Sequence, residues 1–310
     1  MISTLPDTLL GLGMRLPTPA DRLSFAVLKR LFLSIGRLTP IVVPIRFGGL
    51  TISAPLTHSA VYWRYRPASM NRNYVLLTQH VLNKRKGIIV DVGANIGDGI
   101  VLLRSQSIDT PVYAIECADD TFDLLRENTA ELDNVILEKA YLGASAQTRD
   151  QPSDRTRVAG TATEGGAAPD VTTLDSLLDA RSNPAVAMLK TDTDGFDAKV
   201  LYGSAKTIDT QRPIIFAEVM ENLFNKNGDS SSELLRYLAS KTYSRMMIWD
   251  NDGVPLGCRD VAAGLSDLLP TYPGEQGKPY LDIAFCTEED RSILDAVEHA
   301  AYHARPCQII

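Results

Sequence analysis

The segment Ile88–Gly99 constrains the fold of this 310-residue chain more than any other. An apolar, β-branched run carries Asp91 and breaks into a turn that contains Gly93 and Gly97, after which an apolar pattern resumes. This pattern predicts a buried strand, a tight loop and a helix N-terminus, which together bring backbone N–H groups against a small ligand. The spacing Asp-x-Gly-x-x-x-Gly differs from the Gly-x-Gly-x-x-Gly pattern of dinucleotide-binding proteins.

Strands and helices alternate along most of the chain. The pattern predicts strands at Ile88–Val92, Val112–Glu116, Val135–Lys139, Ala185–Lys190, Ile214–Val219, Ser244–Trp249 and Tyr280–Phe285. It predicts helices at Asn71–Asn83, Gly99–Ser105, Asp120–Leu132, Thr173–Leu178, Phe196–Leu201, Ser231–Ser240 and Glu289–His303. Such alternation indicates a mainly parallel sheet covered on both faces, in which ligands bind beyond the carboxyl ends of the strands.

The first 68 residues are predicted to form an N-terminal extension, and residues 69–310 the main domain. The extension combines a basic amphipathic helix over residues 22–37 with a β-hairpin around Gly48 and Gly49. The helix either packs on the main domain or docks on an anionic membrane surface or a partner protein. Residues 144–170 are rich in Ser, Thr, Gly, Ala and Asp, which indicates a variable loop.

The composition excludes several classes of protein. A net charge of −7 argues against a nucleic-acid partner. Four scattered cysteines without a Cys-x-x-Cys pair indicate neither a disulfide framework nor a zinc site, and they fit a reducing compartment such as the cytoplasm. No apolar run is long enough for a transmembrane segment, and the N-terminus does not have the pattern of a signal peptide. The oligomeric state is not indicated.

Acidic residues lie at the ends of four predicted strands: Asp91, Glu116, Asp192 and Glu218. The glycine loop and helix N-terminus favour a ligand carboxylate, and Asp91 suits a cationic amino group. Glu116 can accept hydrogen bonds from both hydroxyls of a ribose. A ligand with these groups and no pyrophosphate is S-adenosylmethionine. Alternatively, Asp91 stabilises the turn and Glu116 is a solvated strand end.

A second acidic motif surrounds Asp192, Asp194 and Asp197. Three acids at the mouth of a strand repel one another unless something compensates them, and Lys190 could pair with one. The others could bind a divalent metal, accept a proton or hold substrate hydroxyls. We expect Asp192 to have a functional role and Asp197 to cap the following helix.

Four blocks in this order resemble the FkbM family of methyltransferases. The blocks are Val90–Gly97 with Ala114–Glu116, Thr173–Leu177, Leu189–Asp197 and Arg212–Glu218. The likeness extends over about Ile88–Glu221, the central portion of the chain. Asp194 and Asp197 depart from it, because the family commonly has Glu at both positions.

The resemblance implies a Rossmann-like class I methyltransferase fold, an α/β architecture with a mainly parallel seven-stranded sheet whose last strand is antiparallel. It implies methyl transfer from S-adenosylmethionine, usually to a hydroxyl of a sugar or glycan or of a secondary metabolite. The cofactor-binding residues it implies are Asp91, Gly93, Asn95, Gly97 and Glu116. It places Asp192 and Glu218 on the acceptor side as catalytic residues.

The general base and the reaction class stay open at this point. Asp192 could accept the hydroxyl proton, or a metal held by Asp192 with Asp194 or Glu218 could activate the hydroxyl. His58 and His80 precede the glycine loop, and either could serve as a base. One alternative is an enzyme like a nucleotide-sugar oxidoreductase, which the misplaced third glycine disfavours. Another is a non-catalytic scaffold that binds the cofactor or has lost it.

Overall fold

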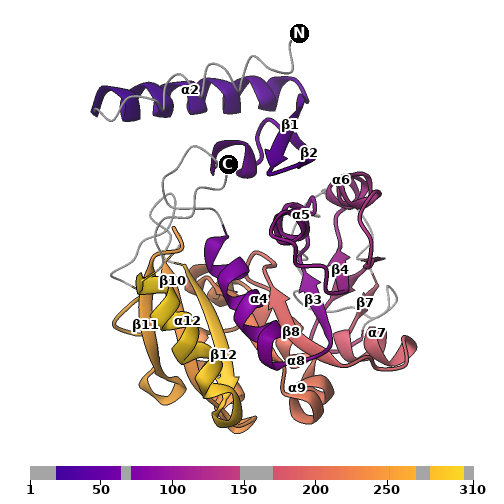
Figure 1. The fold of residues 1–310 in the computed structure, drawn as a ribbon, viewed down its shortest axis with the longest axis vertical. Helices are drawn as coiled ribbons and strands as arrows, with labels where there is room; N and C mark the ends of the chain where they lie inside the picture. Colours follow the sequence, from indigo (N-terminus) through magenta and orange to yellow (C-terminus); the bar gives the residue numbers. More distant parts are fainter. Residues whose placement is uncertain (1–18, 64–70, 147–169, 251, 270–279, 304–310) are drawn as a thin grey trace.

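The computed structural model describes residues 19–63, 71–146, 170–250, 252–269 and 280–303 (Figure 1). Its centre is an eight-stranded sheet with the order β11-β10-β12-β9-β8-β3-β4-β5. The strands are β3 (Ile88–Val92), β4 (Val112–Glu116), β5 (Val135–Lys139), β8 (Val186–Thr191), β9 (Ile214–Val219), β10 (Tyr243–Asp250), β11 (Pro255–Asp260) and β12 (Leu281–Thr287).

The strand directions confirm the predicted Rossmann-like class. The strands from β5 through β4, β3 and β8 to β9 are successively parallel. The last strand, β12, is antiparallel and lies between β9 and β10. The strand order reverses between β3 and β8, since β4 and β5 follow on one side of β3 and β9 on the far side of β8. Ligands of doubly wound sheets bind at such a reversal.

The sheet has one strand more than the predicted seven. The additional strand, β11, pairs with β10 as an antiparallel hairpin at the edge of the sheet. Pro255 and Gly257 weaken the strand signal there, because proline cannot donate to a ladder and glycine has no side chain to pack. An edge position tolerates both residues, so the sequence pattern missed this strand.

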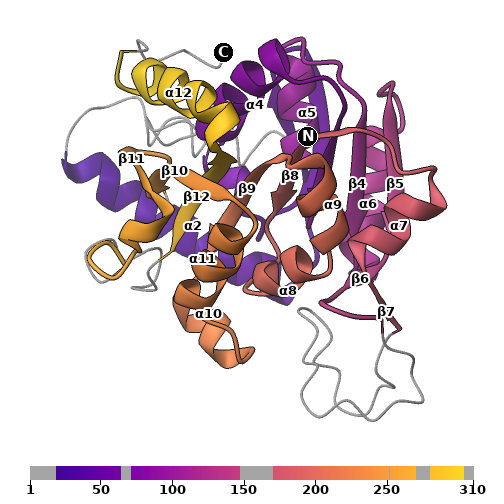
Figure 2. The ribbon, with the colours of Figure 1, turned by 90° about the horizontal axis from the view of Figure 1, so that it is seen from below.

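Helices cover both faces of the sheet, as predicted (Figure 2). They are α4 (Arg72–Lys84), α5 (Asp98–Ser105), α6 (Asp119–Thr129), α7 (Leu174–Ala180), α8 (Asp197–Tyr202), α9 (Ala205–Gln211), α10 (Glu221–Lys226), α11 (Ser231–Ser240) and α12 (Arg291–His303). Side chains of α4, α5, α6 and α12 build one core with Ile89, whereas those of α7 to α11 build another with Val90. The short helices α9 and α10 were not predicted.

The N-terminal part forms its own layer above α5. It consists of α2 (Pro19–Leu38), the hairpin β1 (Val42–Phe47) and β2 (Leu50–Pro55), and α3 (Ala60–Trp63). Its core includes Ile45 and Ile52 and continues into Val101 and Leu102 of α5. The amphipathic helix and the hairpin outside the main sheet are therefore confirmed. A boundary at residue 68 stays a prediction, because residues 64–70 lie outside the described ranges.

The predicted loop 144–170 lies mostly outside the described residues as well. The chain on either side of it forms a small parallel sheet of β6 (Tyr141–Leu142) and β7 (Val171–Thr172). None of the described helices has the length and apolar character needed to cross a bilayer.

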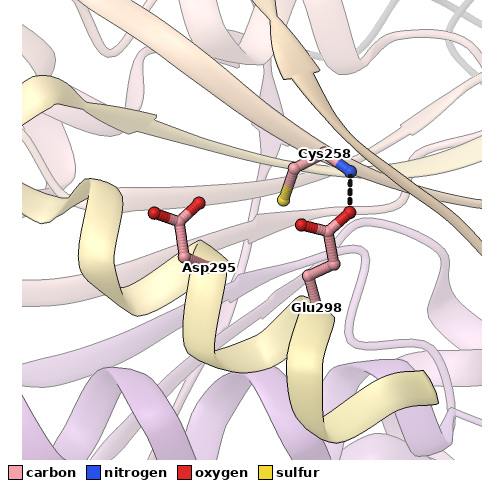
Figure 3. A group of neighbouring side chains, drawn as sticks. All are labelled: Cys258, Asp295 and Glu298. Atoms are coloured by element: carbon pink, nitrogen blue, oxygen red, sulfur yellow. Dashed lines mark hydrogen bonds between the residues drawn. The ribbon is translucent and has the colours of Figure 1, made fainter.

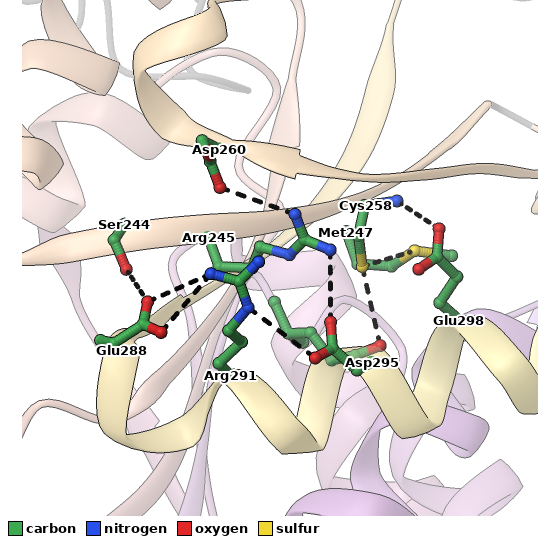
Figure 4. Close-up of polar contacts among 10 residues, drawn as sticks. Ser244, Arg245, Met247, Cys258, Asp260, Glu288, Arg291, Asp295 and Glu298 are labelled. Atoms are coloured by element: carbon green, nitrogen blue, oxygen red, sulfur yellow. Dashed lines mark hydrogen bonds and ion pairs between the residues drawn. The ribbon is translucent and has the colours of Figure 1, made fainter.

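Ionic contacts fix the C-terminal helix α12 on the edge of the sheet (Figure 4). Arg245 of β10 lies 3.3 Å from Asp295 of α12 and 3.6 Å from Asp260 of β11. Arg291, at the start of α12, pairs with Glu288 at 3.4 Å. The buried side chains of α12 and α11 belong to different cores, so the two helices cover opposite faces of the sheet.

Candidate active site

The glycine loop after β3 touches the end of β8. Gly93 has φ of +78°, and a Cβ placed there would lie 1.9 Å from the carbonyl oxygen of Asp192. Only glycine combines this backbone conformation with so close an approach. Gly97 has φ of +83° and immediately precedes α5. The structure therefore brings the predicted cofactor loop against the predicted acceptor-side acid.

Glu116 at the end of β4 braces this loop. Its Oε2 accepts a hydrogen bond from the backbone N–H of Asn95 at 2.9 Å. Its Oε1 accepts from the N–H groups of Cys117 and Ala118, each at 2.9 Å. With 8% of its surface exposed, Glu116 is buried, so the alternative of a solvated strand end is wrong. A carboxylate oxygen offers two acceptor positions, and Oε2 uses one of them within the protein.

Of the two histidines that precede the loop, His58 contacts it. Its Nε2 lies 3.3 Å from Oδ1 of Asn95. The ring of His80 instead hydrogen-bonds the carbonyl of Leu76 within α4, at 3.0 Å from Nδ1. His58 therefore belongs to the surroundings of the glycine loop, and His80 belongs to its own helix.

A buried ion pair lies beneath the loop. The ammonium of Lys190 is 2.8 Å from Oδ1 of Asp91, its neighbour on β3, and 3.7 Å from Oδ2 of Asp192. Burial alone would lower the pKa of Lys190, but the two carboxylates outweigh it and hold that pKa above its usual range. The pairing of Lys190 with an acid of the second motif is confirmed for Asp192, but its closer partner, Asp91, was not predicted. Asp91 is 1% exposed, and its Oδ1 already pairs with the ammonium of Lys190.

The acids after β8 differ in exposure. The side chain of Asp192 is 51% exposed, and Asp194 is exposed as well. Asp197 is fully buried and accepts hydrogen bonds from the N–H groups of Thr193 and Gly195 at 3.2 and 3.3 Å. The expected capping by Asp197 is wrong, because Phe196 occupies the N-cap and the Asp197 carboxylate binds the preceding loop instead. Burial raises the pKa of Asp197 to about 7.

A pair of acidic residues on β9 and β12 lies beside this loop. Glu218 stands directly opposite Asp282 in the antiparallel ladder. Burial, and then the charge of Asp192, raise the pKa of Glu218 well above its usual value. Burial also raises the pKa of Asp282 to about 7, although Asn73 of α4 donates a 2.7 Å hydrogen bond to it. Oε2 of Glu218 is buried and has no hydrogen-bond partner among the described residues.

Sequence reasoning missed Asp282 and Asn73. One signal for Asp282 was present, because it is a charged residue within the otherwise apolar run Leu281–Phe285. A charge inside a buried strand is rarely found without a partner or a task. No comparable signal marks Asn73, a polar residue near the start of an amphipathic helix.

The arrangement can accept protons and hydrogen-bond hydroxyl groups. Asp197 and Asp282, whose carboxyl pKa is raised to about 7, can gain or lose a proton near neutral pH. Asp192 is the exposed member beside the glycine loop, and Glu218 offers a buried oxygen without a partner. In the part of the chain that the structure describes, Asp192, Asp194 and Glu218 do not form a set with donor atoms within 4.8 Å of one another. The geometry therefore does not support a metal held by all three of these acids.

Another group has the composition of a metal site: Cys258, Asp295 and Glu298 (Figure 3). Each member already has a partner within the protein. Glu298 accepts a 2.7 Å hydrogen bond from the backbone N–H of Cys258, and Asp295 pairs with Arg245. Burial, followed by the charge of Glu298, raises the pKa of the Cys258 thiol to about 12. These contacts join β11 to α12, and we assign them to stability.

Comparison with known proteins gives one family. A profile of the methyltransferase FkbM domain matches residues 91–245, which is half of the chain and contains the glycine loop, Glu116, Asp192 and Glu218. No curated protein matches the chain in sequence.

Several solved structures are similar at low identity. Methyltransferase FkbM from Methylobacillus flagellatus KT is 16% identical, with 90% of this chain and 58% of that chain covered and a TM-score of 0.43. This chain thus spans less than two thirds of that protein. An O-methyltransferase from Bacillus cereus in complex with SAH is 12% identical, with 69% and 80% covered and a TM-score of 0.38. M. jannaschii TYW2 in complex with AdoMet is 15% identical, with 80% and 88% covered and a TM-score of 0.38.

Proposed function

The chain belongs to the FkbM family of methyltransferases, and we propose that it transfers a methyl group from S-adenosylmethionine to a hydroxyl of a sugar, a glycan or a secondary metabolite. The observation that carries this proposal is the contact between the glycine loop and the acidic loop. At Gly93 a Cβ would lie 1.9 Å from the Asp192 carbonyl, so a ligand on the glycine loop is next to an exposed carboxylate. Methyl donor and acceptor need that adjacency.

The cofactor side of the proposal keeps the five residues of the loop region: Asp91, Gly93, Asn95, Gly97 and Glu116. Gly93 and Gly97 let the backbone approach the ligand, and the first turn of α5 offers N–H groups to a carboxylate. Glu116 holds Asn95 and retains an acceptor position on Oε2 for a ribose hydroxyl. For Asp91 we revise the role. It holds Lys190 at the strand ends, since its Oδ1 is occupied by that ammonium.

On the acceptor side, the protein's task is to position a hydroxyl and to receive its proton. S-adenosylmethionine supplies an electrophilic methyl group, so no further activation of the donor is required. We assign proton acceptance to Asp192, the exposed carboxylate nearest the loop. Glu218 orients the hydroxyl through its buried Oε2, which has no partner among the described residues. Several acids at one edge of the sheet suit an acceptor with several hydroxyls.

The proposal routes the proton to a carboxylate instead of a metal-bound oxygen, because Asp192, Asp194 and Glu218 do not form a three-ligand set among the described residues. We place the reaction in a reducing compartment, the cytoplasm. The three cysteines that the structure describes, Cys117, Cys258 and Cys286, are all free, which supports this placement.

Calorimetry separates the proposed function from its alternatives. Titration of the folded protein with S-adenosylmethionine should release heat, and titration with NAD should not. Heat with NAD alone would support the oxidoreductase alternative, and heat with neither ligand would contradict cofactor binding. A protein that binds S-adenosylmethionine is then incubated with a trideuteromethyl-labelled donor and extracts of glycans and metabolites. Label on an oxygen supports the proposal, whereas label only on nitrogen or carbon contradicts it.

A further inference from the structure

The N-terminal helix α2 presents an apolar stripe to the outside of the molecule. Leu31, Ile35 and Leu38 are 52%, 37% and 85% exposed, and their spacing of four and three residues places them on one helix face. The neighbouring face is occupied. Phe32 is buried in the core of the hairpin layer, and a Cβ at Gly36 would lie 2.9 Å from the Thr57 side chain.

Positive charge flanks this stripe. Arg30 and Arg37 are exposed, and neither forms an ion pair with a carboxylate in the part of the chain that the structure describes. Arg46 on β1 is also exposed. Exposed arginines beside exposed leucines are the composition of a helix that lies in a membrane interface.

Positively charged residues are concentrated in one stretch of the sequence that includes most of this helix. The range Arg22–Val90 contains eleven Lys and Arg and no Asp or Glu, although the whole chain has a net charge of −7. The other twenty Lys and Arg, and all 38 Asp and Glu, lie outside this range. The part of α2 after Asp21 and the hairpin β1–β2 belong to the basic range, and they lie at one end of the long axis of the molecule (Figure 1). The acidic main domain therefore lies to one side of α2, and α2 can approach a surface without the main domain in between.

We propose that the face of α2 formed by Leu31, Ile35 and Leu38, together with Arg30 and Arg37, docks this enzyme on an anionic lipid surface. Three apolar side chains alone bind a bilayer weakly, and so do two arginines. The combination of both signals gives stable peripheral binding. Nucleic acid would use the arginines but leave the leucines in water. Antiparallel pairing of two copies about Ser34 would bring Arg30 of one copy near Arg37 of the other, so like charges oppose self-association.

Co-sedimentation of the full chain with vesicles tests this docking. The probes are vesicles of phosphatidylcholine alone and of phosphatidylcholine with phosphatidylglycerol. We expect binding to the anionic vesicles at low salt, at least tenfold weaker binding to the neutral ones, and loss of binding in Leu31→Asp/Leu38→Asp. Arg30→Gln/Arg37→Gln should weaken binding roughly tenfold or more and reduce its salt dependence. Val254→Asp, at an apolar residue that is 46% exposed in the C-terminal half, is the matched control and should bind as the parent does.

Other outcomes overturn the proposal. Equal binding to neutral and anionic vesicles, or equal loss in Val254→Asp, removes the role of this face. If light scattering shows a dimer that Leu31→Asp/Leu38→Asp converts to a monomer, the face is an interface between copies. If a single-stranded oligonucleotide competes fully with the vesicles and Leu31→Asp/Leu38→Asp still binds it, the basic range serves nucleic acid. Circular dichroism and S-adenosylmethionine binding of each variant show that the main domain is folded.

Discussion

Glu218 and Asp282 face each other across the β9–β12 ladder, and the pKa of each is raised by burial. Asp282 has a pKa of about 7 in the folded protein, against about 4 for an unfolded chain. Between these values the folded state binds more protons than the unfolded state. The free energy of unfolding should therefore fall as pH rises from about 4 to about 7.

Asp282→Asn removes this titration and keeps a carbonyl oxygen that can accept from Asn73. We expect the variant to be more stable than the parent at pH 8, on the order of 2 kcal/mol, and the gain to vanish near pH 4. Urea unfolding at both pH values measures it. Glu127→Gln, at an exposed position on α6, is the control and should show no such pH dependence. A gain of equal size at pH 4 would mean that ionisation of Asp282 is not the cause.

We expect alanine substitutions at two glycines with the same φ to differ sharply in their effect on stability. Gly93 and Gly228 both have φ of +78°, but a Cβ at Gly228 meets no atom within 4 Å, whereas one at Gly93 overlaps the carbonyl of Asp192. Gly228→Ala should cost about 1–2 kcal/mol of stability from the backbone conformation alone. Gly93→Ala must also separate β3 from β8, so we expect a larger loss of stability and loss of S-adenosylmethionine binding in calorimetry. Equal effects of the two substitutions would remove the close approach as the reason for glycine at this position.

Because Asp91 and Lys190 form a buried pair, we expect substitutions of the two residues to have strongly coupled effects on the free energy of unfolding. Lys190→Met leaves the Asp91 carboxylate buried without a cation, which should cost about 3–5 kcal/mol in urea unfolding. The double variant Asp91→Asn/Lys190→Met should recover most of this loss, because it removes the uncompensated charge. Lys206→Met breaks the exposed pair with Asp179 and should cost about 0–1 kcal/mol. A double variant no more stable than Lys190→Met would show that the lysine acts through its packing.

The sequence predicted the elements that carry strong periodicity. Ile88–Val92, Val112–Glu116, Val135–Lys139 and Ile214–Val219 have the same bounds in the structure as in the prediction. Each of these strands begins with apolar or β-branched residues and is bounded by turn residues, so local pattern determines them. The strand Pro255–Asp260 was missed because hairpin pairing at an edge, and not its own residues, makes it a strand.

The geometry of the site could be predicted from the sequence only where a single segment of the chain determines it. The glycine loop and the acids Asp192 and Glu218 follow strands, so their place at one edge of the sheet could be inferred. The pairing of Asp282 with Glu218 could not, because β12 inserts between β9 and β10 from far along the chain. Burial, which separates exposed Asp192 from buried Asp197, likewise depends on packing that the sequence does not display.

Two matched variants test the proposal that Asp192 is the proton acceptor of the acidic loop. Asp192 and Asp194 are both exposed and lie two residues apart, and Asn is compatible with the φ of +51° at Asp194. If Asp192 accepts the hydroxyl proton, Asp192→Asn should lower kcat about 10²–10⁴-fold and leave the Kd for S-adenosylmethionine unchanged. Asp194→Asn should change kcat only a few-fold. Single-turnover methyl transfer and calorimetry measure the two quantities. Equal losses in both variants, together with loss of parental activity in EDTA and recovery in magnesium, would instead assign both carboxylates to a metal.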